Sequence, residues 1–458
     1  MRMTGLDMSR ATHGRWHGKV PESVNGVATD TRGFVAGEAF LALRGPNFDG
    51  HHFAAAVADQ AVALIGDSEG LSQWSELDAS MLEVEDTLQA FGEIAHAWRK
   101  QLSQTTVIAI SGSYGKTSLR SMLELGFSGL GYKVAATRAN LNNLIGVPQT
   151  LLAVTAESDI ALIECGISDP RDMDRLSTIV NADLAVLTGI TSAHAEGLGG
   201  LEGVVREKAA LFDHLAADAW CALGEGVAEQ LSGFGIAVDN SLLLANQSGA
   251  VQWQLDGKRL RLFDGQENAS IELALPAAHW AANLALAAGI MLRFSRQQGR
   301  AVCLTEISQI LANWQAPAGR MQRLTGGNGS LILDDCYNAN PVSMQAALDT
   351  LVAMDGRRIV FLGDMAELGE DSVAAHASLQ LANIDQVYLI GPQMQVLAEA
   401  CANAVWFETT AEAEQFCRTT SFDANDTILI KASRSMGLEK IVACLSEQAS
   451  KEGAAHAV

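Results

Sequence analysis

A β-branched run that leads through a glycine-rich turn into an amphipathic stretch restricts the fold of this chain more than any other feature. Residues 105–110 read TTVIAI, the turn reads SGSYGK, and a helical pattern runs from Thr117 to about Leu130. A buried strand followed by a crossover helix is the repeating unit of parallel sheets. Further buried strands are predicted at 160–163 and 184–187, separated by helix-length sequence. We therefore expect an α/β fold with a parallel sheet in this part of the chain.

The 458 residues are enough for three α/β domains, and the pattern of the chain changes twice. Residues 1–100 mix short apolar runs with Gly and Asp turns, which predicts a small α/β N-terminal domain. Residues 101–315 hold the glycine-rich turn and predict a central P-loop-type domain with a parallel sheet. Residues 316–458 predict a Rossmann-like, doubly wound C-terminal domain, with strands at 331–334, 358–362, 386–390, 404–407 and 427–430.

Two stretches late in the central domain differ from its parallel-sheet pattern. Between 251 and 275 the period of the pattern changes to two, with apolar residues alternating with polar ones around the turn Asp256-Gly257, which predicts a hairpin at an antiparallel edge of the domain. Residues 279–294 are apolar nearly all round, which predicts a buried helix.

Composition and charge exclude several classes of protein. The chain is 48% hydrophobic and 18% charged, as in globular proteins with large cores. No run approaches the ~18 apolar residues of a membrane helix, and the first residues lack the apolar core of a signal peptide, so we expect a cytoplasmic protein without membrane insertion. A net charge of −22 disfavours nucleic acid as a partner, although a small phosphorylated substrate suits a locally basic site. The seven cysteines show no CxxC spacing and are expected to be free thiols.

The turn after the first central strand has the composition of a phosphate-binding loop. Such a loop directs backbone N–H groups and a helix N-terminus at a phosphate chain, with Lys116 on the terminal oxygens and Thr117 on Mg²⁺. The full GxxxxGK[ST] spacing would need glycine at 110, where the chain has Ile110. The match is to a shorter variant, and a structural turn is the alternative. The predicted binding residues are Gly112, Ser113, Gly115, Lys116, Thr117 and Ser118.

Polar residues also follow three other predicted strands. Glu164 ends one apolar strand and His194 lies just beyond the next, so both are expected at the carboxyl edge of the sheet, where Mg²⁺ ligands would lie. Isolated surface groups are the alternative. Asp335 follows a strand of the third unit and precedes Pro341, so it marks either a crevice mouth or an ordinary helix entry. Lys208 lies in an amphipathic helical stretch, where a solvated lysine is the default interpretation.

Taken together, these residues resemble the Mur ligase family, the ATP-dependent amide-forming enzymes of cell-wall peptidoglycan synthesis. Four stretches carry the resemblance: 29–32 with 49–51, 140–143 with 145–148, 335–341, and 363–369. The branch that the chain resembles attaches D-alanyl-D-alanine to UDP-N-acetylmuramoyl-tripeptide. The Asp-Asn-Pro-Arg motif of the branch that adds diaminopimelate is absent. The resemblance implies a UDP-substrate-binding N-terminal domain, a central ATPase domain, a Rossmann-like C-terminal domain, a cytoplasmic monomer, and roles in cell shape and cell division.

The resemblance also implies a role for each matching residue. The UDP-muramoyl substrate would be held by Asp30, Thr31, Arg32, Asn142 and Asn143. ATP would be held by the phosphate loop with His279, Asn283, Arg320 and Asp335. Two Mg²⁺ ions would be held by Thr117, Glu164, His194 and Lys208, the last as a carbamate that bridges metals. Further substrate contacts in the C-terminal domain would come from Asn338, Asp364, Lys431 and Arg434. The catalytic set would be Lys116, Lys208, His194 and Arg320.

The implied chemistry explains why cations are needed. A carboxylate must attack the γ-phosphate of ATP, and because both partners are anions, Lys116, Arg320 and Mg²⁺ would neutralise them in a positioned site. The acyl phosphate would then react with a neutral amine, giving an amide, ADP and phosphate. Closure of the domains would shield the acyl phosphate from water.

The chain departs from the family pattern at four positions. Tyr114 stands in the phosphate loop where a small or amide residue is usual, Ala139 stands before Asn140 in place of Gly, and Ala432 stands in place of the Gly of a Lys-Gly-Ser-Arg motif. Trp280 stands where the family has an Asn at the adenine, and an indole can stack on a base but cannot supply the donor and acceptor of an amide.

These departures leave two alternatives to the D-alanyl-D-alanine-adding ligase. One is a diverged ligase that joins another amine and carboxylate. The other is a non-catalytic protein that binds nucleotide without turnover, which would have no use for Glu164, His194 and Lys208 together. A generic P-loop switch or kinase would not account for the motifs at both ends of the chain.

Overall fold

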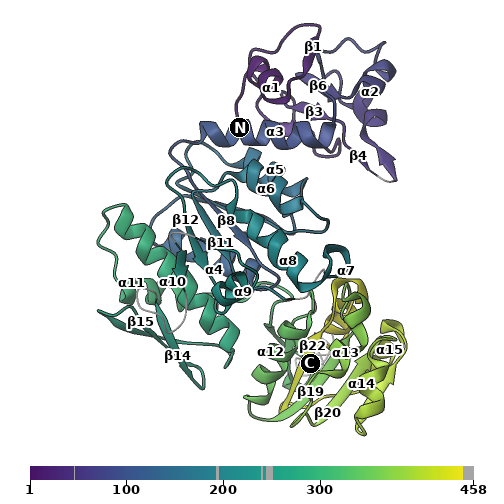
Figure 1. The fold of residues 1–458 in the computed structure, drawn as a ribbon. Coiled ribbons are helices and arrows are strands. Elements are labelled where there is room, and N and C mark those ends of the chain that lie inside the picture. Colours follow the sequence, from purple (N-terminus) through teal and green to yellow (C-terminus); the bar gives the residue numbers. More distant parts are fainter. Residues whose placement is uncertain (46, 192–194, 239–240, 244–250, 447–458) are drawn as a thin grey trace, which may run out of the picture.

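The computed structural model describes residues 1–45, 47–191, 195–238, 241–243 and 251–446. The chain forms three α/β lobes that follow one another in sequence, with the N-terminus in the upper lobe and the C-terminal sheet in the lower lobe of Figure 1. This arrangement confirms the predicted α/β class. The boundaries at 100 and 315 stay predictions. Among the described residues, no helix is long and apolar enough to cross a membrane.

The N-terminal lobe is built on a mixed five-stranded sheet. Its strand order is β1-β7-β6-β3-β2, with β1 antiparallel to β7 and the other neighbours parallel. Helix α1 begins with a capping box between Thr4 and Asp7, which satisfies backbone N–H groups of its first turn. The remaining elements are β1 Arg15–His17, β2 Val27–Ala28, β3 Ala39–Leu41, β6 Ala63–Gly66, β7 Met81–Glu83, the small β4 Arg44–Gly45 and β5 Phe48–Asp49 hairpin, η1 Gly50–Ala56, α1 Gly5–Thr12 and α2 Ser68–Gln73.

Helix α3 (Thr87–Gln101) joins the N-terminal lobe to the central lobe and lies across α5 and α6 in Figure 1. The apolar side chains of α3, including Phe91 and Ile94, are buried in one core that contains strand residues of both lobes. Arg99 fixes the C-terminal end of the helix, because its guanidinium donates to the Asp183 carboxylate at 2.8 Å and to the carbonyl of Val180 at 3.2 Å. The two lobes therefore share a single apolar core.

The central lobe contains a fully parallel six-stranded sheet of order β13-β12-β11-β8-β10-β9. Along β8, Ile108 and Ile110 face α4 and α10, while Val107 and Ala109 face α3, α5 and α6, as the strand period of two requires. The predicted strands at 105–110, 160–163 and 184–187 correspond to β8, β10 and β11, whereas β9, β12 and β13 were not predicted. The strands are β8 Thr106–Ser111, β9 Val134–Ala136, β10 Ile160–Glu164, β11 Leu184–Leu187, β12 Trp220–Leu223 and β13 Ser241–Leu243.

The helices of the parallel sheet connect successive strands. They are α4 Lys116–Gly129, α5 Gly146–Ala153, α6 Asp172–Val180, α7 Ala195–Leu198, α8 Gly200–Ala209, η2 Ala210–Phe212 and α9 Val227–Gly233. The predicted helix from Thr117 to about Leu130 is α4.

The predicted hairpin is present, but it is part of a separate sheet rather than an edge strand pair of the parallel sheet. Strands β14 (Gln252–Asp256), β15 (Arg259–Phe263) and β16 (Asn268–Glu272) form an antiparallel three-stranded sheet whose apolar face joins the core around α4 and α10. The predicted range, 251–275, includes β16, but the sequence indicated only a hairpin and not a third strand. The predicted buried helix is α10 (Ala278–Gln297), which is followed by α11 (Leu304–Leu311).

The C-terminal lobe is a doubly wound sheet of order β17-β18-β22-β19-β20-β21, parallel except for β17. All five predicted strands are present, and only β17 was not predicted. A capping box between Asn340 and Ser343 begins α12, with Pro341 at its first turn. The elements are β17 Gln322–Thr325, η3 Gly327–Gly329, β18 Leu331–Asp334, α12 Pro341–Val352, β19 Arg357–Gly363, η4 Gly369–Asp371, α13 Ser372–Ala377, β20 Gln386–Ile390, α14 Gln395–Ala400, β21 Ala404–Phe407, α15 Thr410–Thr419, β22 Asp426–Lys431 and η5 Arg434–Met436.

Candidate active site

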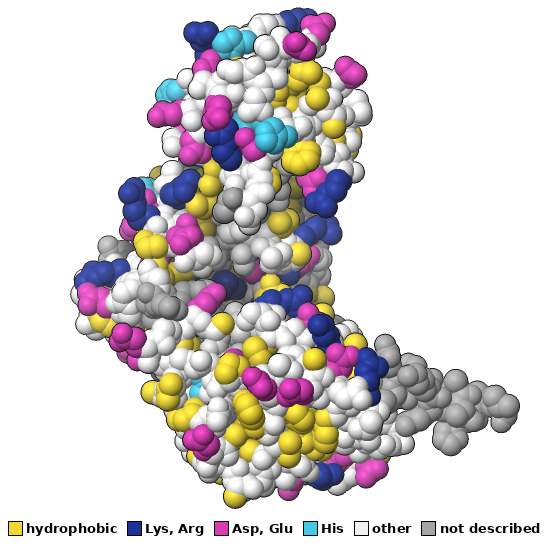
Figure 2. All heavy atoms as spheres, turned by 90° about the vertical axis from the view of Figure 1, so that its right-hand side faces the viewer, with side chains coloured by type: hydrophobic (Ala, Val, Ile, Leu, Met, Phe, Trp, Pro, Cys, Tyr) yellow, Lys and Arg dark blue, Asp and Glu magenta, His cyan; other side chains and the backbone are white. Residues whose placement is uncertain are grey.

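A cavity of about 610 Å³ lies between the central and C-terminal lobes. Figure 2 shows a hollow above the lower lobe that Lys and Arg side chains border, so the site is locally basic in an acidic chain. Most of the predicted site residues line this cavity: Ser113, Gly115, Lys116, Thr117, Ser118, Asn142, Asn143, Glu164, Lys208, His279, Asn283, Arg320, Asp335, Asn338, Lys431 and Arg434. Residues from the carboxyl edges of two sheets thus meet at one place. The strand-end argument predicted each edge separately, and the structure shows that the two edges share a cavity.

The glycine-rich loop connects β8 to α4 in a shape that depends on its glycines. Gly112 has φ +147°, and a Cβ there would lie 2.0 Å from the Thr188 hydroxyl. That hydroxyl donates to the carbonyl of Tyr114 at 2.5 Å, which holds the loop against β11. Gly115 precedes α4 with φ +81° and gives its first turn no side-chain cap. The N–H groups of that turn are therefore available to an anion.

Lys116 lies at the start of α4, inside the cavity. Its Nζ donates to the carbonyl of Gly112 at 2.5 Å. Burial lowers the pKa of the ammonium group to about 8, the nearby Arg320 charge acts in the same direction, and the Glu164 carboxylate opposes both. Lys116 and Arg320 thus place two cationic side chains at one cavity, which suits a polyanion.

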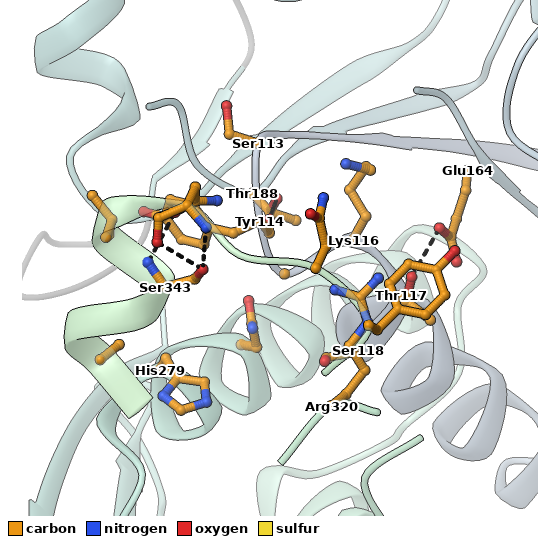
Figure 3. Close-up of a pocket in the computed structure, with 18 of the residues that line it drawn as sticks. Ser113, Tyr114, Lys116, Thr117, Ser118, Glu164, Thr188, His279, Arg320 and Ser343 are labelled. Carbon is orange, nitrogen blue, oxygen red and sulfur yellow. Dashed lines mark hydrogen bonds between the residues drawn. The ribbon is translucent and has the colours of Figure 1, made fainter. Parts of the chain in front are cut away.

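Glu164 ends β10 next to the phosphate loop, and its side chain is only 1% exposed. One carboxylate oxygen accepts from the Thr117 hydroxyl at 3.1 Å, as Figure 3 shows, and the other accepts from Nε of Arg120 at 2.7 Å. The buried carboxylate and the hydroxyl form an oxygen donor pair beside the phosphate loop. The predicted partner His194 lies outside the described residues.

Lys208 lies on α8 and is 1% exposed, so the interpretation as a solvated helix lysine is wrong. Burial lowers its pKa well below the ordinary lysine value, the charge of Lys116 lowers it further, and Glu207 opposes the shift. The side chain lines the cavity, and the lowered pKa favours its neutral form.

The C-terminal lobe contributes a second group of charges. The Arg320 guanidinium lies 4.1 Å from the ring centroid of Tyr337, and burial lowers its pKa. Asp335 accepts from Nζ of Lys431 at 2.6 Å and from the backbone N–H of Met321 at 3.0 Å. Lys431 also donates to the carbonyl of Asn338 at 3.0 Å. Asp335 is therefore held between a strand end and the residue after Arg320.

Helix α10 presents His279 and Asn283 to the cavity, and Trp280 also lines it although its side chain is nearly buried. The buried Nδ1 of His279 has no hydrogen-bond partner among the described residues. Burial lowers the His279 pKa to about 4, with Asp335 opposing and Lys431 reinforcing the shift. Trp280 is 4% exposed and packs in the core of the C-terminal lobe. The indole offers little surface on which a base could stack.

Five predicted site residues in the described part of the chain do not line this cavity: Gly112, Asp30, Thr31, Arg32 and Asp364. Asp30, Thr31 and Arg32 lie on an exposed loop of the N-terminal lobe, where Arg32 pairs with Asp30 at 2.5 Å. Hydrogen bonds from Arg32 lower the Asp30 pKa to about 2. Asp364 accepts from the backbone N–H of Met394 at 2.9 Å, so its carboxylate braces a loop within the C-terminal lobe.

Three residues that shape the site received no role from the sequence. Arg120 lies one turn after Thr117 on the predicted helix, so helical spacing could have placed it near Glu164. Thr188 directly follows a predicted strand and could have been found by the same strand-end argument. Tyr337, beneath Arg320, lies within a quoted motif, but no signal indicated a contact with arginine.

Three family models match successive parts of the chain. They are described as Mur ligase family, catalytic domain, at residues 23–99; Mur ligase middle domain, at 110–291; and Mur ligase, glutamate ligase domain, at 319–434.

Relatives match along almost the full length. The chain is 32% identical over 438 residues to the UDP-N-acetylmuramoyl-tripeptide–D-alanyl-D-alanine ligase of Escherichia coli, covering 93% of this chain and 94% of that protein. A crystal structure of MurF from Acinetobacter baumannii matches with a TM-score of 0.83 and 28% identity, over 98% of this chain and 99% of the other. The fold is also that of the MurF ligase from Thermotoga maritima in complex with ADP, with a TM-score of 0.80 and 23% identity, over 93% and 98%. The chain belongs to the Mur ligase family.

Proposed function

We propose that this chain is the ATP-dependent ligase that adds D-alanyl-D-alanine to UDP-N-acetylmuramoyl-tripeptide in peptidoglycan precursor synthesis. The observation that carries the proposal is that one cavity unites the phosphate loop, two buried lysines and an arginine of the C-terminal lobe. This occurs in a chain that aligns with 94% of an Escherichia coli ligase of that name. A nucleotide-binding scaffold would gain nothing from burying Lys208 and Glu164 beside the loop, because both burials carry a desolvation cost.

The residues of the cavity suit a two-step amide synthesis. A substrate carboxylate oxygen attacks the γ-phosphorus of ATP, the bond to ADP breaks, and an acyl phosphate forms. The neutral amine of D-alanyl-D-alanine then attacks the acyl carbon, phosphate leaves, and the nitrogen loses a proton. Lys116 and Arg320 supply fixed positive charge where two anions must approach, so the protein removes repulsion that water would have to screen.

The donor set beside the loop suits Mg²⁺. Thr117 and Glu164 would hold the ion, and hard oxygen donors are what Mg²⁺ prefers. Mg²⁺ commonly keeps several waters and takes further oxygens from substrate phosphates, so two protein ligands are enough to begin its site. Bound there, Mg²⁺ would neutralise charge on the phosphate oxygens.

Lys208 fits the proposed carbamate. Its lowered pKa gives the neutral amine that can attack CO₂, forming an N–C bond and releasing a proton. The resulting anion, with His194, would hold a second Mg²⁺. The change turns a buried amine into a ligand of the kind that Mg²⁺ prefers.

The UDP-muramoyl substrate would bind on the side of the central and N-terminal lobes, and the dipeptide would bind on the side of the C-terminal lobe. Asn142 and Asn143 line the cavity on its central side, and Gln149 of α5 donates to Thr29 at 3.1 Å, which links the central lobe to the loop that carries Asp30 to Arg32. We place the UDP-muramoyl group along this path. The dipeptide would lie near Asn338, Lys431 and Arg434, while Asp364 would support its pocket from behind.

Phosphate release from ATP and Mg²⁺ tests the proposal. Purified protein should release phosphate only when UDP-N-acetylmuramoyl-tripeptide and D-alanyl-D-alanine are both present. Release with another amine and carboxylate, but not with this pair, would indicate the diverged ligase. ATP binding without any release would indicate the non-catalytic alternative.

A further inference from the structure

The segment between the central and C-terminal lobes, residues 312–321, is called the linker here. Trp314 lies near its start, and its indole Nε1 donates to the Ser121 hydroxyl at 2.8 Å. Ser121 lies on α4, and its hydroxyl donates in turn to the carbonyl of Ser118 at 2.8 Å. Because the hydroxyl has one proton and accepts freely, both bonds form together. The start of the linker is therefore fastened to the helix whose first turn forms the phosphate site.

The ring of Trp314 also contacts Trp280 of α10, whose indole packs in the core of the C-terminal lobe. It lies edge-to-face against Trp280, with ring centroids 5.0 Å apart and planes at 86°. Trp280 is buried with Met321 and Met344 in the core of the C-terminal lobe. The two indoles thus connect α4 to the C-terminal core.

The other end of the linker carries Arg320. Its guanidinium lies over Tyr337, while the next residue, Met321, donates its N–H to Asp335. The N–H of Tyr337 donates to the carbonyl of Gly319 at 3.2 Å. Arg320 therefore moves with the C-terminal lobe, yet its charge acts on Lys116 and Glu164 across the cavity.

Behind the linker there is a second cavity of about 470 Å³, which Trp280, Trp314 and Met321 line. Protein does not fill the space on that side, so packing there does not hold the start of the linker, at Trp314, in place. The position of Arg320 relative to the phosphate loop then depends strongly on the indole pair and on the bond from Trp314 to Ser121.

We propose that Trp314 is a positioning residue that sets the distance between Arg320 and the terminal phosphate of ATP. The proposal rests on the proposed use of ATP. Loss of the indole N–H would let the linker shift into the cavity behind it and would draw Arg320 away from the γ-phosphate. ADP has no γ-phosphate, so its binding would change little. The effect is therefore specific for the terminal phosphate.

Calorimetric titration with Mg²⁺ and either ADP or the non-hydrolysable analogue AMP-PNP tests this inference. Trp314→Phe keeps an aromatic ring and removes the donor, and Ser121→Ala removes the acceptor. Each should weaken AMP-PNP binding about tenfold, as expected when a fixed charge partner is misplaced, and leave ADP binding within about twofold. Arg320→Ala should show the same selectivity. Trp314→Phe combined with Arg320→Ala should bind AMP-PNP no more weakly than Arg320→Ala alone, because Trp314 acts through Arg320.

Trp406→Phe is the matched control, since its indole also donates one hydrogen bond, at 2.8 Å to the carbonyl of Gly391, but on the far edge of the C-terminal sheet. It should leave both affinities unchanged. Equal losses of ADP and AMP-PNP in Trp314→Phe, or losses that multiply with Arg320→Ala, would overturn the positioning role. Unchanged AMP-PNP binding in Trp314→Phe would overturn the positioning role as well. If the wild type binds both nucleotides but releases no phosphate with the two substrates, the proposed function fails and the titration still decides the role of Trp314. If the wild type binds neither, both fail.

Discussion

The N-terminal lobe joins the central lobe through a shared apolar core, whereas the C-terminal lobe faces it across a polar cavity. In the first junction, α3 buries Phe91 and Ile94 among strand residues of both lobes, and Arg99 donates a hydrogen bond to the carboxylate of Asp183. In the second, the apolar contact is concentrated around Trp280, and buried cations line the rest.

The two junctions serve different purposes: the apolar one stabilises the fold, and the polar one holds the residues of the candidate reaction. A close-packed apolar junction resists displacement because any shift opens voids. A junction of charged side chains around a cavity gains its full set of partners only when an anion is bound, so it favours closure on the ligand. We infer that the two upper lobes move as one body and that the C-terminal lobe closes on them.

The largest effect that this comparison predicts is at the second junction. Lys116→Ala should lower turnover by about 10³-fold or more, because a preorganised charge partner of the phosphates is lost. The melting temperature should change little. Lys133→Ala, which removes an exposed lysine paired with Glu157, is the control and should keep normal rates. Near-normal turnover of Lys116→Ala would break the assignment of chemistry to this cavity.

Lys208→Ala should also lower turnover by about 10³-fold, since an anion that replaces a buried amine in the metal site would be missing. Small carboxylic acids added to the assay should restore part of the rate by occupying the vacated space. The same acids should not help Lys116→Ala, which lacks a cation. Equal rescue of both variants would argue against the carbamate.

Phe91→Ala examines the first junction. Loss of a fully buried aromatic ring should lower the free energy of unfolding by about 3–5 kcal/mol. Hydrogen exchange followed by mass spectrometry should show faster exchange in both the N-terminal and central lobes. Phe422→Ala, in the separate C-terminal core, should accelerate exchange only there. Faster exchange confined to the N-terminal lobe in Phe91→Ala would contradict the shared core.

The smallest predicted effect concerns His279 at the second junction. Because its pKa is lowered to about 4, the unfolded chain binds the proton more strongly than the native state between pH 6.5 and about 4. The native state should therefore lose stability as pH falls through this window, with the full loss below about pH 4. Unfolding at several pH values should show this loss reduced in His279→Asn. His52→Asn, at an exposed histidine, should behave as wild type in this window.

Local patterns predicted the elements best where burial and strand period agree. The β-branched run of β8 and the turn after it indicated the phosphate loop, and the strand-end rule placed Glu164 correctly. The shared core of α3 was not predicted, because the apolar face of Phe91 and Ile94 gives the same helical pattern whether it covers one sheet or two. A sequence gives little indication of a domain boundary where one helix packs against the domains on both sides of it.

The candidate site likewise contains features that depend on tertiary packing and that the sequence did not predict. Burial of Lys208 depends on how α8 packs against the phosphate loop, and a lysine in an amphipathic helix carries no local sign of that. Trp280 was expected at the base of the nucleotide because of its position beside His279, but its indole is covered by Trp314 and the C-terminal core. Such contacts arise between segments distant in sequence. The Asp364 carboxylate likewise accepts a hydrogen bond within its own lobe, from the backbone N–H of Met394.

The different exposure of the cysteines gives the molecule a built-in pair of labelling points. Cys165, Cys221, Cys336, Cys417 and Cys444 are buried, and burial raises the thiol pKa of Cys165 and Cys417 to about 12, so these groups react slowly with alkylating dyes. Cys303 and Cys401 are partly exposed, one at the start of α11 in the central lobe and one after α14 in the C-terminal lobe. Donor and acceptor fluorophores would attach to two different lobes without any engineered residue. Energy transfer between them would then report the closing of the C-terminal lobe in real time.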